Sequence, residues 1–183
     1  MSLIKILSRG LGTGVGGKVL QVVQASDDTL YSLSIPDSTT DVAGSIAYSI
    51  TPSSASSKII INFTIPQLRH AGSVAGLRIR LYRQIAGGGY SHVTGLSGTA
   101  SSSRLGSLMG NYSGYGDTGQ DANRSLNFSG SIVDSPNTTS AIDYKFYVGT
   151  GDGSNTVYIN RTGNDTDATY TSRTRTHVIL MEI

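Results

Sequence analysis

The alternating apolar run at 58–65 constrains the fold of this chain more than any other stretch. Ile59, Ile61, Phe63 and Ile65 occupy every second position. Side chains at every second position of a β-strand share one face, so the pattern predicts a strand with a strongly apolar face. Since no other run in the chain is as apolar, we expect this strand in the middle of the core sheet. Pro66 lacks a backbone N–H and is expected to end the strand.

A shorter alternating stretch precedes this run. Ile46, Tyr48 and Ile50 fall at alternate positions and predict a strand over 45–50. The segment 51–57 between the two stretches is rich in serine and contains Pro52, which favours a turn. We therefore expect 45–66 to form a hairpin of two strands joined by a loop.

Further strands are predicted along the rest of the chain. They lie at 18–24, 29–35, 77–85, 105–109, 126–128, 143–148, 157–159 and 175–183. In 77–85 the leucines and isoleucine are expected to face inward, and Arg78, Arg80 and Tyr82 outward. His177 sits in an apolar strand and is expected to pack in the core.

This pattern indicates the fold class. It gives roughly eight to ten short strands separated by turn residues, with no convincing helix. We predict an all-β, antiparallel β-sandwich or jelly-roll-like head with a short N-terminal arm.

The division into an arm and a head follows from the glycine content of the first residues. Residues 1–17 end in a glycine-rich segment that favours neither helix nor strand. Leu3, Ile4, Ile6 and Leu7 form an apolar tip before it, which is expected to dock on another protein. A disordered N-terminal start is the alternative. The head is predicted to span 18–183.

The composition excludes several classes of function. Charged residues make up 14% of the chain, against about 25% in ordinary globular proteins, and the net charge is +2. This gives no clustered basic surface for a nucleic acid. The chain has no cysteine, which excludes disulfides, thiol catalysis and cysteine-bound metal. No stretch is long and apolar enough for a membrane span, so no membrane insertion is expected, and no secretory signal is recognisable.

No motif for catalysis or for a cofactor stands in a convincing context. The segment 12–17 matches GxGxxG, but no strand precedes it and no helix follows. His70, His92 and His177 are far apart, and Glu182 is the single glutamate. We predict a non-enzymatic protein without a cofactor. The acidic segment 164–167 and Asp152 could supply oxygens for calcium, although turn formation is the favoured interpretation.

The tyrosine-rich segment 111–117 is the best candidate for ligand recognition. Tyrosine, serine, glycine and asparagine combine rigid amphipathic rings with adaptable hydrogen bonding, as in the recognition loops of antibodies. The candidate residues are Tyr112, Tyr115 and Asp117, which Tyr90 and His92 could join. A glycan or a protein is the expected ligand. The alternative is a hairpin loop that packs on itself or on a neighbouring subunit.

Two segments of the first third carry a resemblance to a known family. They are Gly-Lys-Val-Leu-Gln-Val-Val at 17–23 and Ile-Thr-Pro-Ser-Ser-Ala-Ser-Ser-Lys-Ile-Ile-Ile at 50–61. This pattern resembles one that recurs in small virion structural proteins of aquatic tailed bacteriophages, of the tail-fibre or capsid-surface type. The resemblance covers mainly residues 15–65. It implies a β-sandwich head, a homotrimer, display on the virion surface and no enzymatic activity, but it carries over no functional residue.

The resemblance leaves several roles open. A long fibre has a shaft of repeats, whereas this chain has only its glycine-rich arm. A capsid decoration protein, a head fibre or a short tail fibre is therefore expected, with capsid or tail proteins as partners. A receptor-binding tip would recognise a host surface glycan through the tyrosine-rich segment. The other hypotheses are a stand-alone carbohydrate-binding, lectin-like module and a hydrolase such as a depolymerase.

Overall fold

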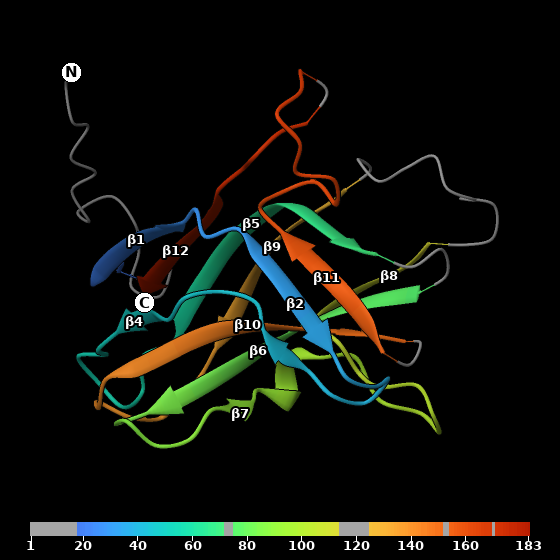
Figure 1. Cartoon of the computed structure of the whole chain (residues 1–183). Coiled ribbons are helices and arrows are strands. Elements are labelled where there is room, and N and C mark those ends of the chain that lie inside the picture. Colours follow the sequence, from blue (N-terminus) through green and yellow to red (C-terminus); the bar gives the residue numbers. More distant parts are fainter. Residues whose placement is uncertain (1–17, 72–74, 114–124, 152–153, 170) are drawn as a thin grey trace.

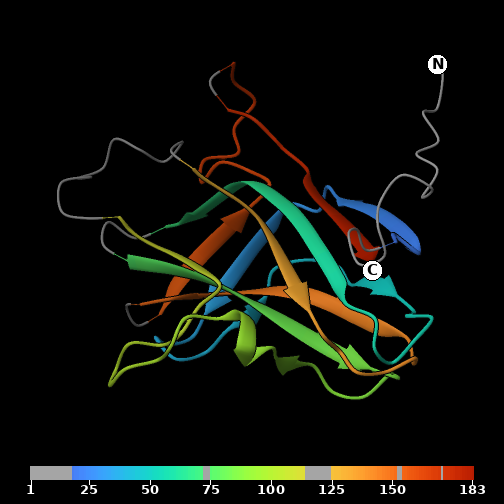
Figure 2. The ribbon, with the colours of Figure 1, turned by 180° about the vertical axis from the view of Figure 1, so that it is seen from behind.

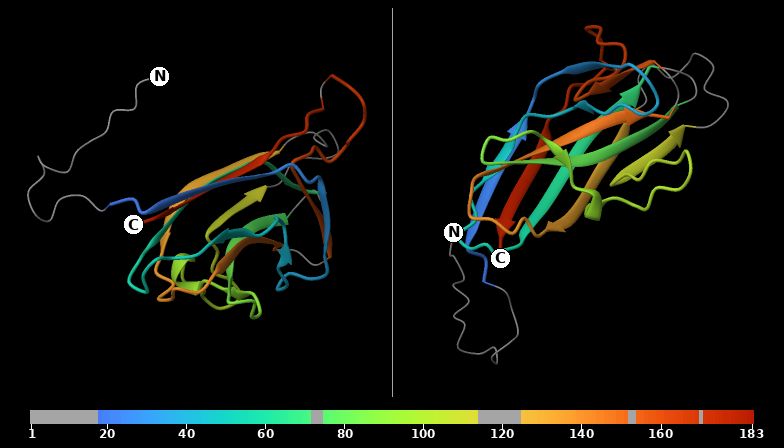
Figure 3. Two further views of the ribbon diagram at one scale, coloured as in Figure 1. Left: turned by 90° about the vertical axis from the view of Figure 1, so that its left-hand side faces the viewer. Right: turned by 90° about the horizontal axis from the view of Figure 1, so that it is seen from below.

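The computed structural model describes residues 18–71, 75–113, 125–151, 154–169 and 171–183, without the side chains of 75 and 111–113. In these ranges the chain forms two antiparallel β-sheets packed face to face as a sandwich (Figure 1). Figure 3 shows the two layers in profile. The predicted all-β sandwich is confirmed. Within the described ranges the helical element is the short 3-10 helix η2, Thr94–Leu96, and no helix there could span a membrane.

Each sheet contains six strands. In several places two short strands pair with different parts of the same long strand, as β3 and β4 do with β10. Sheet A has the order β1-β12-β5-β11-β2, with β9 paired to the free side of β5. Its strands are β1 Gln21–Asp27, β2 Tyr31–Ile35, β5 Ile59–His70, β9 Leu126–Asp134, β11 Asn155–Ile159 and β12 Thr176–Glu182. Sheet B has the order β3-β10-β6-β7, with β4 paired to β10 and β8 to β6. Its strands are β3 Val42–Ala43, β4 Tyr48–Ile50, β6 Ala75–Ile85, β7 Ser91–His92, β8 Met109–Ser113 and β10 Ile142–Thr150.

The order of the strands is that of a jelly roll. The first strands, β1 and β2, pair with the last, β12 and β11. The next, β3 and β4, pair with β10; then β5 pairs with β9, and β6 with β7 and β8. The chain is thus one long antiparallel hairpin whose arms pair from the ends inward while it wraps around the core, as in jelly rolls.

The predicted central strand is central. β5 pairs with β12 and β11 on one side and with β9 on the other, which Figure 2 shows from behind. Its alternating residues Ile59, Ile61, Phe63 and Ile65 are at most 4% exposed. Phe63 reaches across to Phe146 of sheet B, with the ring centroids 4.8 Å apart. Alternation of apolar side chains on both inner faces therefore builds the core.

The predicted hairpin at 45–66 is wrong. β4 lies in sheet B beside β10, whereas β5 lies in sheet A. The loop 51–57 carries the chain from one sheet to the other. A period-two pattern shows which side chains share a face, but it does not show which strand is the neighbour.

The predicted end of the central strand at Pro66 is also wrong, because β5 continues to His70. Ile65 lies opposite Phe128 and Leu68 opposite Leu126, so β5 has one extra residue at this point. Both Gln67 and Leu68 are buried, as expected where a β-bulge interrupts the alternation. Proline is tolerated at a bulge since no ladder hydrogen bond is lost there.

Two further expectations are corrected by the register. His177 is exposed, because Thr176, Val178, Leu180 and Glu182 form the buried face of β12. The polar ends of that face are accommodated by hydrogen bonds, such as that from Thr176 Oγ1 to Asn160 Oδ1 at 2.9 Å. The strand predicted at 105–109 begins only at Met109. The preceding residues form a turn closed by the hydrogen bond from Gly98 N–H to Ser107 O at 3.0 Å.

Candidate interaction surfaces

The outer face of sheet A carries a row of aliphatic side chains that crosses four of its six strands, β1, β12, β5 and β9. Val22 of β1 lies opposite Met181 of β12, Met181 opposite Ile60 of β5, and Ile60 opposite Val133 of β9. All four belong to the set of positions that alternates with the buried ones. Val22 is 58% exposed and Val133 46%. We call these four residues the apolar row.

Along the strands, the surroundings of the apolar row are uncharged on one side, whereas the exposed Lys58 lies beside the row on the other side. The next two rows across the sheet consist of Gln24, Ile179, Asn62 and Ser131, and then Ser26, His177, Thr64 and Ser129. None of these twelve described positions is Asp, Glu, Lys or Arg. Toward the other end of the strands, exposed Leu20 and half-buried Ile183 extend the apolar area. Contiguous exposed apolar surface of this kind is typical of interaction sites.

The start of the predicted head lies at the same end of the sandwich as the apolar row. Leu20 N–H donates to Glu182 O at 2.8 Å, which continues the β1–β12 ladder toward Lys18. Figure 3 shows the C-terminus beside the beginning of β1. The predicted docking residues Leu3, Ile4, Ile6 and Leu7 lie outside the described residues.

Glu182 fastens the loop 51–57 to sheet A at this end. Its Oε1 accepts hydrogen bonds from Ser53 N–H at 2.7 Å, Ser53 Oγ at 2.6 Å and Ser57 Oγ at 2.7 Å. Its Oε2 accepts one from Gln21 Nε2 at 2.8 Å. The serine hydroxyls lower the pKa of Glu182 to about 2. Two of the four serines in the segment 50–61, Ser53 and Ser57, thus have a structural explanation: they hold the buried carboxylate that anchors the crossing between the sheets.

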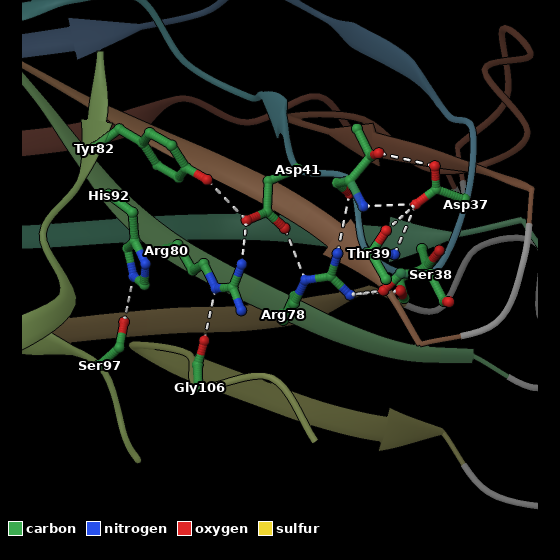
Figure 4. Close-up of polar contacts among 12 residues, drawn as sticks. Asp37, Ser38, Thr39, Asp41, Arg78, Arg80, Tyr82, His92, Ser97 and Gly106 are labelled. Carbon is green, nitrogen blue, oxygen red and sulfur yellow. Dashed lines mark hydrogen bonds and ion pairs between the residues drawn. The ribbon is translucent and has the colours of Figure 1, made fainter. Parts of the chain in front are cut away.

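The outer face of sheet B is built differently, around the carboxylate of Asp41 (Figure 4). Arg78 Nε donates to Asp41 Oδ1 at 2.7 Å, and Arg80 Nη1 donates to Oδ2 at 2.6 Å. The hydroxyl of Tyr82 donates to the same Oδ2 at 3.1 Å. The Asp41 side chain is 2% exposed. A buried carboxylate with two guanidinium partners is well compensated for its lost hydration.

The arginines of this cluster tie loops to the sheet. Arg78 also donates to the carbonyl oxygens of Ser38, Thr40 and Thr150, and Arg80 Nε donates to Gly106 O at 2.6 Å. The prediction that Arg78 and Arg80 point outward is confirmed, but they are buried at 8% and 9% exposure because these loops cover them. Gly149 makes room for the cluster, since a Cβ there would lie 2.5 Å from Arg78 Cζ and from Asp41 Oδ1.

Beside the arginines, aromatic side chains stack on one another across sheet B. Tyr82 lies between His92, at a centroid distance of 5.5 Å, and Tyr147, at 3.9 Å. Tyr90 contacts Tyr147 at 6.3 Å, and Lys145 Nζ lies 4.9 Å above the Tyr90 ring. Burial and the Arg80 guanidinium lower the pKa of His92, whose Nε2 is 2.8 Å from Ser97 Oγ.

The structure brings together part of the predicted recognition site. Tyr90 and His92 share this aromatic cluster, although Tyr147 and Tyr82 lie between them. Tyr112 belongs to β8, opposite Gly76 of β6, so its backbone is on the same sheet. Its side chain, together with Tyr115 and Asp117, lies outside the described residues. Tyr82, Tyr147 and Lys145 were missed as site residues, because only the antiparallel pairing of β6 and β10 places them beside Tyr90.

The acidic segment considered for calcium makes an ion pair. Arg173 Nε and Nη2 donate to Asp165 Oδ1 and Oδ2 at 3.0 and 2.8 Å. This contact lowers the pKa of Asp165. Across the described ranges, no group of three His, Asp or Glu side chains is arranged to hold a metal ion. Asp152 lies outside these ranges.

Comparisons with known proteins give weak likenesses only. No family model matches the chain, and no curated protein matches it. The chain is similar to the structure of the Gx strain of infectious bursal disease virus, with 14% identity and a TM-score of 0.33 over 88% of this chain and 37% of the other. The VP2 subviral particle of the same virus gives 18% identity and a TM-score of 0.32 over 88% and 37%. The Gt strain gives 14% identity and 0.33 over 97% and 42%. This chain therefore spans about two fifths of the length of these structures, and likeness at this level assigns no function to it.

Proposed function

We propose that this chain is a non-enzymatic structural protein of a bacteriophage virion, displayed on the particle surface and docked through residues 1–17. The observation that carries the proposal is the apolar row, an exposed aliphatic surface at the end of the head where residues 18–20 lead into β1. An exposed apolar face with few charges is suited to incorporation into a larger assembly. The resemblance of residues 15–65 to small phage virion proteins supports the same role. Capsid or tail proteins are the proposed partners, and a homotrimer is the proposed form.

Deletion of residues 2–14 tests the docking. We expect virions that carry the deletion to lack the protein, while the purified variant keeps the β-sheet circular dichroism spectrum of the wild type. A sharper variant replaces Leu3, Ile4, Ile6 and Leu7 by serine, and its matched control replaces Lys5 and Ser8 by alanine. The control should be incorporated normally. Normal incorporation of the quadruple serine variant would contradict docking by the apolar tip.

The place on the virion can be resolved by a second experiment. A capsid decoration protein or head fibre stabilises the shell, so its loss should lower the temperature at which particles release their genome. A short tail fibre that binds the host should instead leave shell stability unchanged and support adsorption. Replacing Tyr112 and Tyr115 by alanine should then reduce adsorption, and normal adsorption would show that these tyrosines are structural.

The aromatic cluster on sheet B favours a second candidate function, the binding of a carbohydrate. Sugars pack on aromatic rings, and Tyr90 with the adjacent Lys145 lies on an outer face at a sheet edge. The test is binding of the purified chain to a glycan array, with Tyr90→Ala as the variant. Tyr158→Ala is the matched control, because Tyr158 also carries a cation, Arg161, 5.1 Å from its ring but lies on sheet A. Equal glycan binding by wild type and Tyr90→Ala would exclude Tyr90 from such a site.

A further inference from the structure

We infer that the outer face of sheet A packs against the same face of a second copy of this chain. The inference rests on the registers of four strands and not on the proposed virion role. It names both the face and its occupant. Val22, Met181, Ile60 and Val133 are in direct cross-strand register, so the apolar row is straight and perpendicular to the strands.

The geometry of the row favours a copy of itself as the occupant. A two-fold axis that runs along the row places each of the four side chains opposite its own counterpart. The rows on either side then meet each other, so the polar row that contains Gln24 and Asn62 lies near Leu20 and Lys58 of the other copy. Sheets that pack face to face in this way keep their strands within about 30° of each other and lie about 10 Å apart.

The charge of the face supports the same occupant. A partner selected by electrostatic complementarity requires a patch of one sign, whereas the three rows that begin with Val22, Gln24 and Ser26 hold no Asp, Glu, Lys or Arg, and Lys58 is the charge on the other side of the apolar row. The side-chain amides of Gln24 and Asn62 contain an oxygen that accepts hydrogen bonds, so they can pair with the Lys58 ammonium of the other copy. Interfaces between identical subunits are the more apolar class.

The area corresponds to a weak, concentration-dependent contact. Strands lie about 4.8 Å apart, and outward positions along a strand are about 6.8 Å apart, so four strands by the three rows that the two-fold axis pairs cover roughly 400 Å². Two copies then bury about 800 Å² in total, which is in the size range of weak, transient protein interfaces.

Charge substitutions at the two ends of the row test the inference. The variant is Val22→Lys with Val133→Lys, both at exposed positions on the sheet edges. The matched control is Ser26→Lys with Ser129→Lys, which adds the same charge on the same two strands two rows away. Light scattering and sedimentation of the full chain over a wide dilution series should show an associated wild type and control. The row variant should associate about tenfold more weakly or not at all, because two lysines would have to be buried.

Circular dichroism and the Tm of each variant show whether the head is folded. A wild type that stays monomeric, or that forms trimers and nothing larger, would overturn the inference and leave the face to another protein or to residues 1–17, because a two-fold contact gives an even number of copies. Association of the folded row variant as strong as that of the wild type would also overturn it. Failure of the docking experiment above would not, since self-association is measured on the isolated chain.

Spin labels distinguish this face from the opposite one. The chain has no cysteine, so single labels can be attached at Gln24→Cys on sheet A or at Lys145→Cys on sheet B. If sheet A faces sheet A, the two sheet A labels lie about 17 Å apart plus the label length, because Gln24 is about 6.8 Å to one side of the axis in each copy and the sheets are about 10 Å apart. The two sheet B labels lie on layers about 30 Å apart, because each sheet adds about 10 Å. The reverse order of distances would place the contact on sheet B and contradict the inference.

Discussion

At the scale of single residues, buried charges fasten the parts of the sandwich that the core does not reach. Glu182 holds the loop 51–57 with three donors from two serines. Asp41 holds the loop before β3 against two arginines of β6. Asp134 accepts from Arg83 Nη1 at 2.6 Å and from the Tyr144 hydroxyl at 2.7 Å, between β9, β6 and β10. Such carboxylates couple loops to strands, because each leaves its donors unsatisfied if it is removed.

The pKa of Glu182 predicts an acid-dependent loss of stability. Its ordinary value is 4.5, and the folded protein lowers it to about 2. A lowered folded pKa stabilises the fold fully above the unfolded value, and this contribution is lost as the pH falls from 4.5 toward 2. We expect Glu182→Gln to lower the Tm at neutral pH and to have a smaller effect at low pH. Thermal unfolding at a series of pH values is the measurement.

The loop supplies matched controls for this prediction. Ser57→Ala removes a donor to Glu182 and should lower the Tm, whereas Ser56→Ala lies in the same loop and bonds only locally, to Ser54. A wild type and a Glu182→Gln variant that lose stability in parallel on acidification would show that Glu182 does not carry the effect.

At the scale of secondary-structure elements, β5 organises sheet A and its two faces have different roles. Its inward residues build the core, whereas Ile60 on the other face belongs to the apolar row. Consecutive apolar residues mark this arrangement in the sequence, as in Ile60-Ile61 and Val22-Val23. The alternation predicted the buried face correctly. The alternation does not predict that Ile60 aligns with Met181 and Val133, because that alignment depends on the register between strands.

Substitutions on the two faces of β5 should have unequal effects on stability. Ile61 is fully buried, so Ile61→Ala removes apolar contacts and leaves a cavity. We expect it to lower the free energy of unfolding by about 2–5 kcal/mol. The neighbour Asn62 faces outward, so Asn62→Ala should change stability by less than about 0.5 kcal/mol. Chemical denaturation of both variants checks this, and similar losses for the two would contradict the assigned faces.

At the scale of the whole molecule, the jelly roll makes the ends of the head depend on each other. β12 lies between β1 and β5, so the last strand completes the sheet that the first strand begins. This closure places the beginning of the head, the C-terminal residue and the apolar row at one end, and the Asp41 cluster on the opposite face. The proposed docking and the inferred self-association both use this asymmetry between the two outer faces.

Truncation at the two ends should therefore have opposite results. Removing residues 176–183 deletes β12, which lies between β1 and β5. Both strands then have an edge without a hydrogen-bonded partner, so we expect the chain to lose its folded state. Removing residues 2–14 should leave the head folded. Solubility and far-ultraviolet circular dichroism distinguish the outcomes, and a folded chain without 176–183 would show that β12 is dispensable.

Local residue patterns were enough to predict the class of the fold and the inward faces of its main strands. Period-two alternation at 58–65 is a local property, and it places Ile59, Ile61, Phe63 and Ile65 on one face wherever the strand lies. The partner of each strand depends on long-range contacts, which place β4 in the other sheet and carry β5 through a bulge beyond Pro66. These contacts also gather Tyr90 with Tyr147, cover Arg78 and align Val22 with Val133. These features depend on hydrogen bonds between residues far apart in the chain, and the pattern within one strand carries no information about such pairing.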